Sequence, residues 1–156
     1  STSIKDNILL GQKSSDGDYA KYGEIAGLKS DIAGFPQGYD SLLGERGINL
    51  SGGQKQRVSI ARGLMANTPV LIFDDSFSSL DAQTENILLN NLSKIRKDKI
   101  NIIISHRLST LQDSDIIFVL KDGKIIEQGK HFELLLKKGY YAMTFKEQET
   151  ALEIEA

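Results

Sequence analysis

The sequence predicts an α/β protein in which parallel strands follow an all-helical first part. Two short apolar runs, VLIFDD at 70–75 and INIIISH at 100–106, suit strands buried on both faces of a parallel sheet. Predicted strands alternate with predicted helices over the second half of the chain, which indicates the α/β class. The first fifty residues contain no comparable run, so we expect helices and loops there.

In the first part, Ser3 is placed to cap a short helix that runs to Leu10, and the polar loop GQKSSDGD follows. Short helices are expected at 18–26 and 29–33, before the loop GFPQGYDS. Ser51 then precedes a helix that extends to about residue 66. Its apolar face contains Val58, Ala61, Leu64 and Met65.

In the second part, a helix is expected at about 83–96, between the two strands. The run DIIFVLKDGKIIEQG predicts a hairpin that turns at Asp122-Gly123. Helices at 132–137 and 140–149 follow, with a structural role expected for His131 at the start of the first of them. We therefore divide the chain into a helical subdomain at 1–66 and an α/β part at 67–156.

Composition narrows the class of protein. A chain of 156 residues with 40% hydrophobic and 26% charged residues can bury the core of one soluble domain. Its net charge of −2 argues against a nucleic-acid partner, which needs a basic surface. The absence of cysteine excludes disulfides and thiolate zinc sites. Its apolar runs are too short to cross a bilayer.

Asp74 and Asp75 close the first predicted strand. In P-loop nucleotide hydrolases, a carboxylate in this place holds Mg²⁺. Asp74 would then bind the metal, through water, and Asp75 would face the attacking water. The alternative is that paired acids only make a strand end soluble, and these two residues alone leave both explanations open.

Two other positions suit phosphate. His106 follows the second strand, where a neutral imidazole could hydrogen-bond a γ-phosphate, although a lone histidine more often caps the next helix. Ser51 and the amides of Gly52 and Gly53 form an anion-binding helix start, unless the glycines only supply positive φ. The order and spacing of these residues favour the functional explanation over the structural ones. Asp74 follows Ser51 by 23 positions, and His106 follows Asp74 by 32.

These motifs resemble those of ATP-binding-cassette (ABC) ATPases. The segment LSGGQKQRVSIARGLMANTPVLIFDDSFSSLD resembles their signature motif, Walker B strand and D-loop. ISHRLST resembles the switch-histidine segment, and LKDGKIIEQGKHFELL the C-terminal hairpin and helix. LLGERG, at 42–47, resembles the loop by which ABC exporters touch the coupling helices of their transmembrane domains, although it also reads as a plain polar turn.

The resemblance implies a role for each motif. In this family two nucleotide domains sandwich two ATP molecules, and the signature of one faces the P-loop of the other. Asp81, in the D-loop, would link the two sites, and its position also suits a helix N-cap. The implied set is Asp75 and His106 as catalytic residues, Asp74 as the Mg²⁺ ligand, and Ser51, Gly52, Gly53, Gln54 and Asp81 as nucleotide-binding residues.

The family resemblance also implies an incomplete domain. No G-x-x-x-x-G-K-[ST] pattern occurs in the 156 residues, so we expect the Walker A and Q-loop half to precede Ser1. The P-loop strand of the family lies between the strands at 102–104 and 116–120. Without it, unpaired strand edges and apolar faces should make the chain poorly stable and inactive alone. The expected partners are this missing half, a second nucleotide-binding domain in a homo- or heterodimer, and transmembrane domains at the cytoplasmic face of a membrane.

Asp75 departs from the family pattern, because most active members carry glutamate there. Aspartate is shorter by one C–C bond, ~1.5 Å, and a misplacement of ~1 Å can cost on the order of a hundredfold in rate. DDSFSSLD resembles the degenerate half of heterodimeric exporters. The sequence therefore predicts an ATPase subunit that powers export or, alternatively, a non-catalytic nucleotide-sensing subunit. A DNA-maintenance ATPase of the SMC type would instead place a coiled coil before the signature.

Overall fold

The computed structural model describes residues 2–12, 17–44 and 47–155, with side chains to residue 151. Part of the predicted loop at 11–18, and Glu45 and Arg46 of LLGERG, lie outside these ranges. The chain forms two compact units, Ser1–Ile104 and Ser105–Ala156, and each is described by itself.

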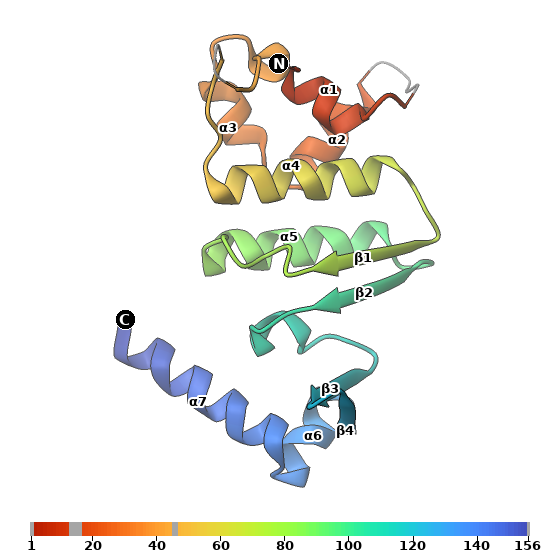
Figure 1. Cartoon of the computed structure of the whole chain (residues 1–156), viewed down its shortest axis with the longest axis vertical. Helices are drawn as coiled ribbons and strands as arrows, with labels where there is room; N and C mark the ends of the chain where they lie inside the picture. Colours follow the sequence, from red (N-terminus) through yellow and green to blue (C-terminus); the bar gives the residue numbers. More distant parts are fainter. Residues whose placement is uncertain (1, 13–16, 45–46, 156) are drawn as a thin grey trace. The chain divides into compact units, whose positions relative to one another are not determined.

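The first unit begins with short helices, as predicted. They are α1 (Ile4–Leu9), α2 (Asp18–Ile25), α3 (Lys29–Gly34), the 3₁₀ turn η1 (Gly38–Asp40) and the longer α4 (Gly52–Met65) (Figure 1). The Ser3 hydroxyl caps α1 by accepting a hydrogen bond from the amide of Asp6 at 3.0 Å. Two isolated β-bridges, Ser3–Leu42 and Leu43–Ile48, are the extended pairings in this otherwise helical part that were not predicted.

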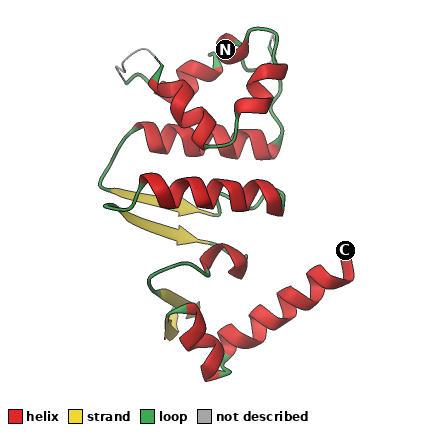
Figure 2. Ribbon diagram, turned by 180° about the vertical axis from the view of Figure 1, so that it is seen from behind, coloured by secondary structure: helices red, strands yellow, loops and turns green. Residues whose placement is uncertain are grey.

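The predicted parallel strands are present in the first unit. Strands β1 (Val70–Asp74) and β2 (Ile100–Ile104) pair in parallel, with Val70 opposite Ile100 and Asp74 opposite Ile104 (Figure 2). Helix α5 (Ala82–Ile95) connects them. The amide of Asp75 extends the pairing by donating to the carbonyl of Ile104 at 3.0 Å.

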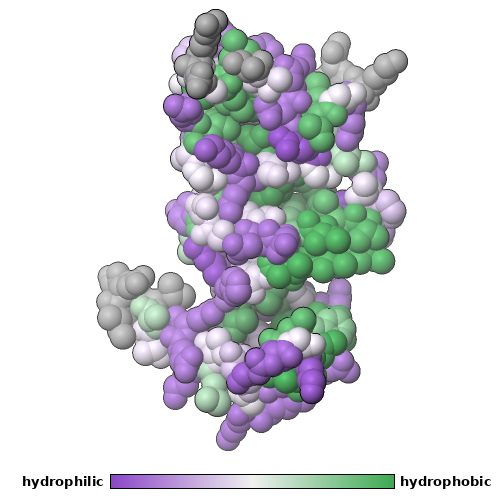
Figure 3. Space-filling view, viewed as in Figure 1, coloured by the Kyte–Doolittle hydropathy of each residue, from purple (hydrophilic) through white to green (hydrophobic). Residues whose placement is uncertain are grey.

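The expectation that both strands are buried on both faces is wrong for this chain. Leu71, Phe73 and Ile103 pack on the helical core, because side chains alternate between the faces of a sheet. The opposite face is apolar and open, and Figure 3 shows apolar side chains gathered over this part of the molecule. This open sheet face consists of Val70, Ile72, Ile100, Ile102 and Ile104, which are 41%, 59%, 61%, 44% and 50% exposed.

The core of the first unit forms between its helices. The predicted apolar face of α4 is buried, with Val58, Ala61, Leu64 and Met65 all at most 8% exposed. These residues join Ile4 and Ile8 of α1 and Leu88 and Leu92 of α5 in one cluster. Burial of this cluster holds α4, and therefore the start of the signature, in a fixed place.

Gln56, on the polar side of α4, ties that helix to the loop at 75–80. Its side-chain amide donates to the carbonyl of Asp75 at 3.3 Å and to the hydroxyl of Ser78 at 2.9 Å. Its side-chain oxygen accepts from the amide of Ser79 at 2.9 Å. One side chain therefore holds the loop that follows β1 at three points.

The second unit is a hairpin with two helices. It contains the 3₁₀ turn η2 (Leu108–Leu111), strands β3 (Ile117–Lys121) and β4 (Lys124–Gly129), and helices α6 (His131–Lys137) and α7 (Tyr140–Glu155). The hairpin turns where predicted, with Asp122 at φ 50° and Gly123 at φ 74°, the positive values that a type I′ turn needs. Among the described residues, no helix is both long and apolar enough to cross a bilayer.

A small core holds this unit together. Ile117, Leu134 and Tyr141 are buried, and the Tyr141 hydroxyl lies 2.8 Å from Nδ1 of the buried His131. Burial also raises the pKa of Tyr141. His131 has the structural position expected for it, at the first residue of α6.

The open sheet face generates a prediction about the isolated chain. We expect it to self-associate, and the double substitution Ile72→Ser/Ile102→Ser to weaken association by roughly tenfold or more. Two half-exposed isoleucines offer on the order of 2 kcal/mol of apolar burial, which serine removes. Sedimentation velocity measures the effect. Ile87→Ser/Ile116→Ser, at two other half-exposed isoleucines, is the control. A strictly monomeric chain with a cooperative, high-temperature melt would contradict this expectation.

A second prediction concerns Gln56. Gln56→Met removes three hydrogen bonds while keeping a long unbranched side chain, so the free energy of unfolding should fall by about 1–2 kcal/mol. Hydrogen exchange at the amide of Ser79 should accelerate. Chemical denaturation and hydrogen exchange are the measurements, with Lys55→Met at the exposed neighbour as control. Equal unfolding free energies for the two variants would show that the three hydrogen bonds of Gln56 do not contribute to stability.

Candidate functional site

Helix α4 begins in the signature segment, where Ser51 and Gln54 form a capping box. The hydroxyl of Ser51 accepts from the amide of Gln54 at 3.2 Å, and the side-chain oxygen of Gln54 accepts from the amide of Ser51 at 2.9 Å. The amide group of Gln54 also donates to Asp31 at 2.8 Å. Gln54 is therefore engaged within the chain, while Ser51 is exposed at the helix start.

The two signature glycines do not serve a left-handed turn. Neither Gly52 nor Gly53 has a positive φ, so that alternative is wrong. Gly53 instead allows close packing. A methyl group at position 53 would lie 3.0 Å from the carbonyl oxygen of Ser79, whereas one at position 52 would meet the Ser79 hydroxyl at an ordinary 3.4 Å. Their amides, in the first turn of α4, have no partner within the helix and can donate to an anion.

The two strand-end carboxylates are both exposed. Asp74 is the last residue of β1, and Asp75 follows it with φ 48°, a left-handed conformation that aspartate tolerates better than most residues. The backbone of Asp75 is fixed on both sides, since its amide donates to Ile104 and its carbonyl accepts from Gln56 and from the Ser78 hydroxyl at 3.0 Å. The loop therefore holds the backbone while the carboxylate remains accessible.

The exposed carboxylates suit a Mg²⁺ ion whose remaining ligands come from a nucleotide and from water. Mg²⁺ in nucleotide sites takes one or two carboxylates, together with phosphate oxygens and waters. Asp74 offers one exposed carboxylate of this kind. Within the described ranges, no group of three histidine, cysteine, aspartate or glutamate side chains could enclose a metal.

Asp81 is the N-cap of α5, as its alternative explanation predicted. Its carboxylate accepts from the amide of Thr84 at 2.8 Å and from the Thr84 hydroxyl at 2.7 Å. The amide bond first, and then the hydroxyl bond, lower the pKa of Asp81 below 3.8. The cap therefore contributes to stability above that pH, and the contribution is lost as the pH falls through the lowered pKa.

His106 belongs to the second unit, and its ring is exposed. The alternative that it caps the next helix is wrong. The residue before η2 is Arg107, and its amide donates to the hydroxyl of Ser105 at 3.0 Å. The carbonyl of His106 accepts from the side chain of Gln148 at 2.8 Å. Its imidazole is thus presented from a backbone that neighbouring residues fix.

The structure brings together part of the predicted set. The signature segment and the loop after β1 meet within the first unit, through the approach of Gly53 to Ser79 and the bonds of Gln56. The sequence did not predict the contacts made by Asp31, Gln56 and Gln148. Their partners are 19 to 42 positions away, and no local pattern reports such contacts.

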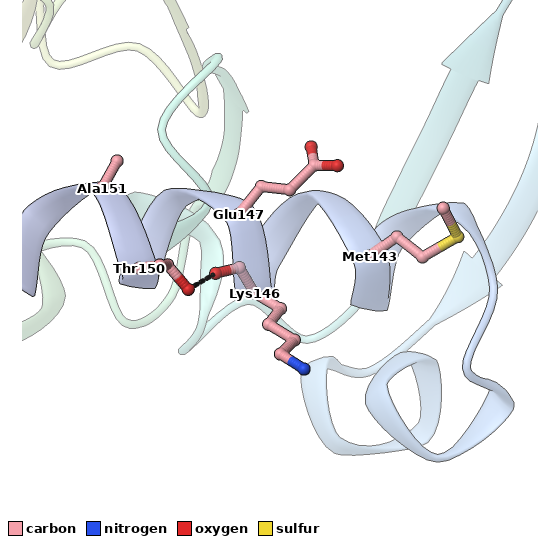
Figure 4. Close-up of a pocket in the computed structure, with 5 residues that line it drawn as sticks. All are labelled: Met143, Lys146, Glu147, Thr150 and Ala151. Atoms are coloured by element: carbon pink, nitrogen blue, oxygen red, sulfur yellow. Dashed lines mark hydrogen bonds between the residues drawn. The ribbon is translucent and has the colours of Figure 1, made fainter.

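The surface hollow in Figure 4 is not part of the candidate site. It is lined by side chains of α7 alone, and it contains none of the predicted residues. Its polar groups include the Thr150 hydroxyl, which donates to the carbonyl of Lys146 at 2.9 Å. The lining residues are Met143, Lys146, Glu147, Thr150 and Ala151.

Comparison with known proteins places the motifs in a family. Residues 4–78 match the family described as ABC transporter. The multidrug resistance-like ATP-binding protein MdlA of Buchnera aphidicola is 46% identical, with 99% of this chain and 27% of the relative aligned. ABC transporter B family member 28 of Arabidopsis thaliana is also 46% identical, over 98% of this chain and 22% of the relative. A putative multidrug export ATP-binding/permease protein of Staphylococcus aureus is 44% identical, over 90% of this chain and 25% of the relative.

A solved structure agrees with these relatives. The bacterial Atm1-family ABC exporter with ATP bound superposes with a TM-score of 0.86 and 42% identity, over 94% of this chain and 26% of the exporter chain. The chain thus spans about a quarter of the length of the proteins it matches. The chain belongs to the ABC transporter family, and it corresponds to the C-terminal part of the exporter-type proteins in that family.

Proposed function

We propose that this chain is the signature and Walker B half of an ATP-hydrolysing domain that powers export across a membrane. The observation that carries the proposal is the contact between the start of the signature helix and the loop after β1. Gly53 and Gln56 hold that loop against α4, so the exposed Ser51, Asp74 and Asp75 belong to one packed assembly. Relatives 44–46% identical to the chain are named for ATP binding and, in part, for multidrug export.

Each exposed group has a task in this proposal. Asp74 would hold Mg²⁺, which when bound would supply positive charge to neutralise the phosphates. Asp75 orients the attacking water and accepts its proton, while His106 donates a hydrogen bond to the γ-phosphate. Because Asp81 caps α5 at the end of the D-loop, it sets where this loop meets a second nucleotide-binding domain.

Ser51 and the amides of Gly52 and Gly53 act on ATP held by another domain. Their donors lie at the start of a 14-residue helix, where the partial positive charge favours phosphate. Gln54, the fourth residue of the nucleotide-binding set, supports this helix start through its cap and its bond to Asp31. The partners of the chain are the P-loop half of its own domain, a second nucleotide-binding domain and transmembrane domains at the cytoplasmic face.

Asp75 points to a slow site within a heterodimer. Its shorter side chain holds the carboxylate back from the position that glutamate would reach, and the bonds to its backbone prevent the loop from moving forward to compensate. The intact signature would then complete the competent site of the partner. A non-catalytic, nucleotide-sensing subunit is the second candidate, and the same aspartate favours it.

The substitution Asp75→Glu separates these candidates. In the full-length protein that carries this segment, we expect turnover at this site to rise by roughly tenfold to a hundredfold, because the carboxylate advances by ~1.5 Å. Single-turnover ATP hydrolysis is the measurement, with Asp75→Asn as the control that lacks a carboxylate. Flat turnover with intact nucleotide binding would show that Asp75 does not limit the reaction. Thermal melting checks that the left-handed backbone at this position accepts glutamate.

The trans arrangement predicts how the isolated chain behaves. Calorimetric titration of Mg-ATP into this chain alone should show no binding, since the described residues provide signature and Walker B groups but no P-loop cradle. Binding should appear when an intact partner domain is added, and Ser51→Ala in this chain should weaken it. Tight binding by the chain alone would contradict the proposal.

A further inference from the structure

The side chain of Gln148 holds the backbone on both sides of Arg107. Its oxygen accepts from the amide of Leu108 at 3.0 Å, and its nitrogen donates to the carbonyl of His106 at 2.8 Å. The two bonds span 40 and 42 positions in the sequence. Asparagine and glutamine are the side chains that carry a donor and an acceptor on one rigid amide, so this pair of contacts suits Gln148 specifically.

Helix α7 is docked in a way that keeps Gln148 in place. Tyr141, Phe145 and Gln148 recur at the spacing that aligns residues on one helix face. Tyr141 is 1% exposed and contacts His131, and its ring stacks with that of Phe145 at 6.3 Å between centroids. Gln148 lies one turn beyond these aromatic anchors and is half-buried.

The rest of the segment is also fixed. The Ser105 hydroxyl accepts from the amide of Arg107 at 3.0 Å. Leu108 and Leu111 pack against the core formed by Ile117, Leu134 and Tyr141. The backbone around His106 is therefore held while its ring stays exposed, so the position from which the imidazole extends is fixed.

We propose that Gln148 is a positioning residue for His106, through which the C-terminal helix sets the contact of the imidazole with the γ-phosphate. The proposal rests on the role proposed above for His106. A purely structural role would not require this residue. The carbonyl of His106 lies in an exposed segment, where water can satisfy it equally well.

The test uses the full-length protein and compares Gln148→Met with Glu149→Met, an exposed neighbour on the same helix, and with His106→Ala. Hydrogen exchange of the peptide at 105–111 reports the bond between Gln148 and the amide of Leu108. Dissociation constants for Mg-ADP and for a non-hydrolysable imido analogue of Mg-ATP report the γ-phosphate contact without depending on turnover at this site. A general loss of structure would weaken both nucleotides equally.

We expect Gln148→Met to accelerate exchange at Leu108 by roughly tenfold. Binding of the ATP analogue should weaken by roughly tenfold, while ADP binding changes less than about twofold. Glu149→Met should change neither. Should Gln148→Met fail to fold, Gln148→Glu keeps the bond to Leu108 and loses the donor to His106, so it should still lower the preference for the ATP analogue.

Three results would overturn the proposal, and they differ in what else they reject. Unchanged exchange at Leu108 in Gln148→Met would show that the two bonds do not hold the segment. Faster exchange with unchanged nucleotide preference, while His106→Ala lowers that preference, would reject positioning and leave the proposed function intact. An unchanged preference in His106→Ala would reject the role of His106 itself.

Discussion

The candidate site depends on how the signature helix packs against the loop that follows the first strand. Gly53 permits this packing because a side chain there would meet the carbonyl of Ser79, and Gln56 secures it with three hydrogen bonds. These contacts hold the start of α4 and the carboxylates at the end of β1 in one body. Gly53 therefore has a task within its own chain, besides the one proposed toward a partner's nucleotide.

Much of the fold could be predicted because its signals are local. Ser3, Ser51 and Asp81 cap helices at the positions their sequence neighbourhoods indicate. The Asp122-Gly123 turn and the apolar face of α4 follow from short-range periodicity and turn chemistry in the same way. The positions of the catalytic candidates followed from motif order, although the sequence alone left a structural alternative open for each.

What could not be predicted is long-range or depends on the surroundings. An apolar run such as VLIFD indicates a strand, but whether its second face is covered depends on elements outside the run, and here Ile72 and Ile102 remain open. Gln56 and Gln148 bond largely to the backbone of loops distant in sequence. A polar residue on a helix gives no pattern that distinguishes such a contact from solvation.

Asp31 of α3 binds two residues of the signature helix, Gln54 and Arg57, through a single carboxylate. One of its oxygens accepts from Gln54 and the other from Arg57 at 2.8 Å, in a pair whose side chains are 15% and 14% exposed. Within the described residues, Nε of Arg57 is buried without a hydrogen-bond partner. The guanidinium therefore relies on its bond to Asp31. Loss of the Asp31 carboxylate would therefore remove a partner from Gln54 and from Arg57 at the same time, at two neighbouring turns of the signature helix.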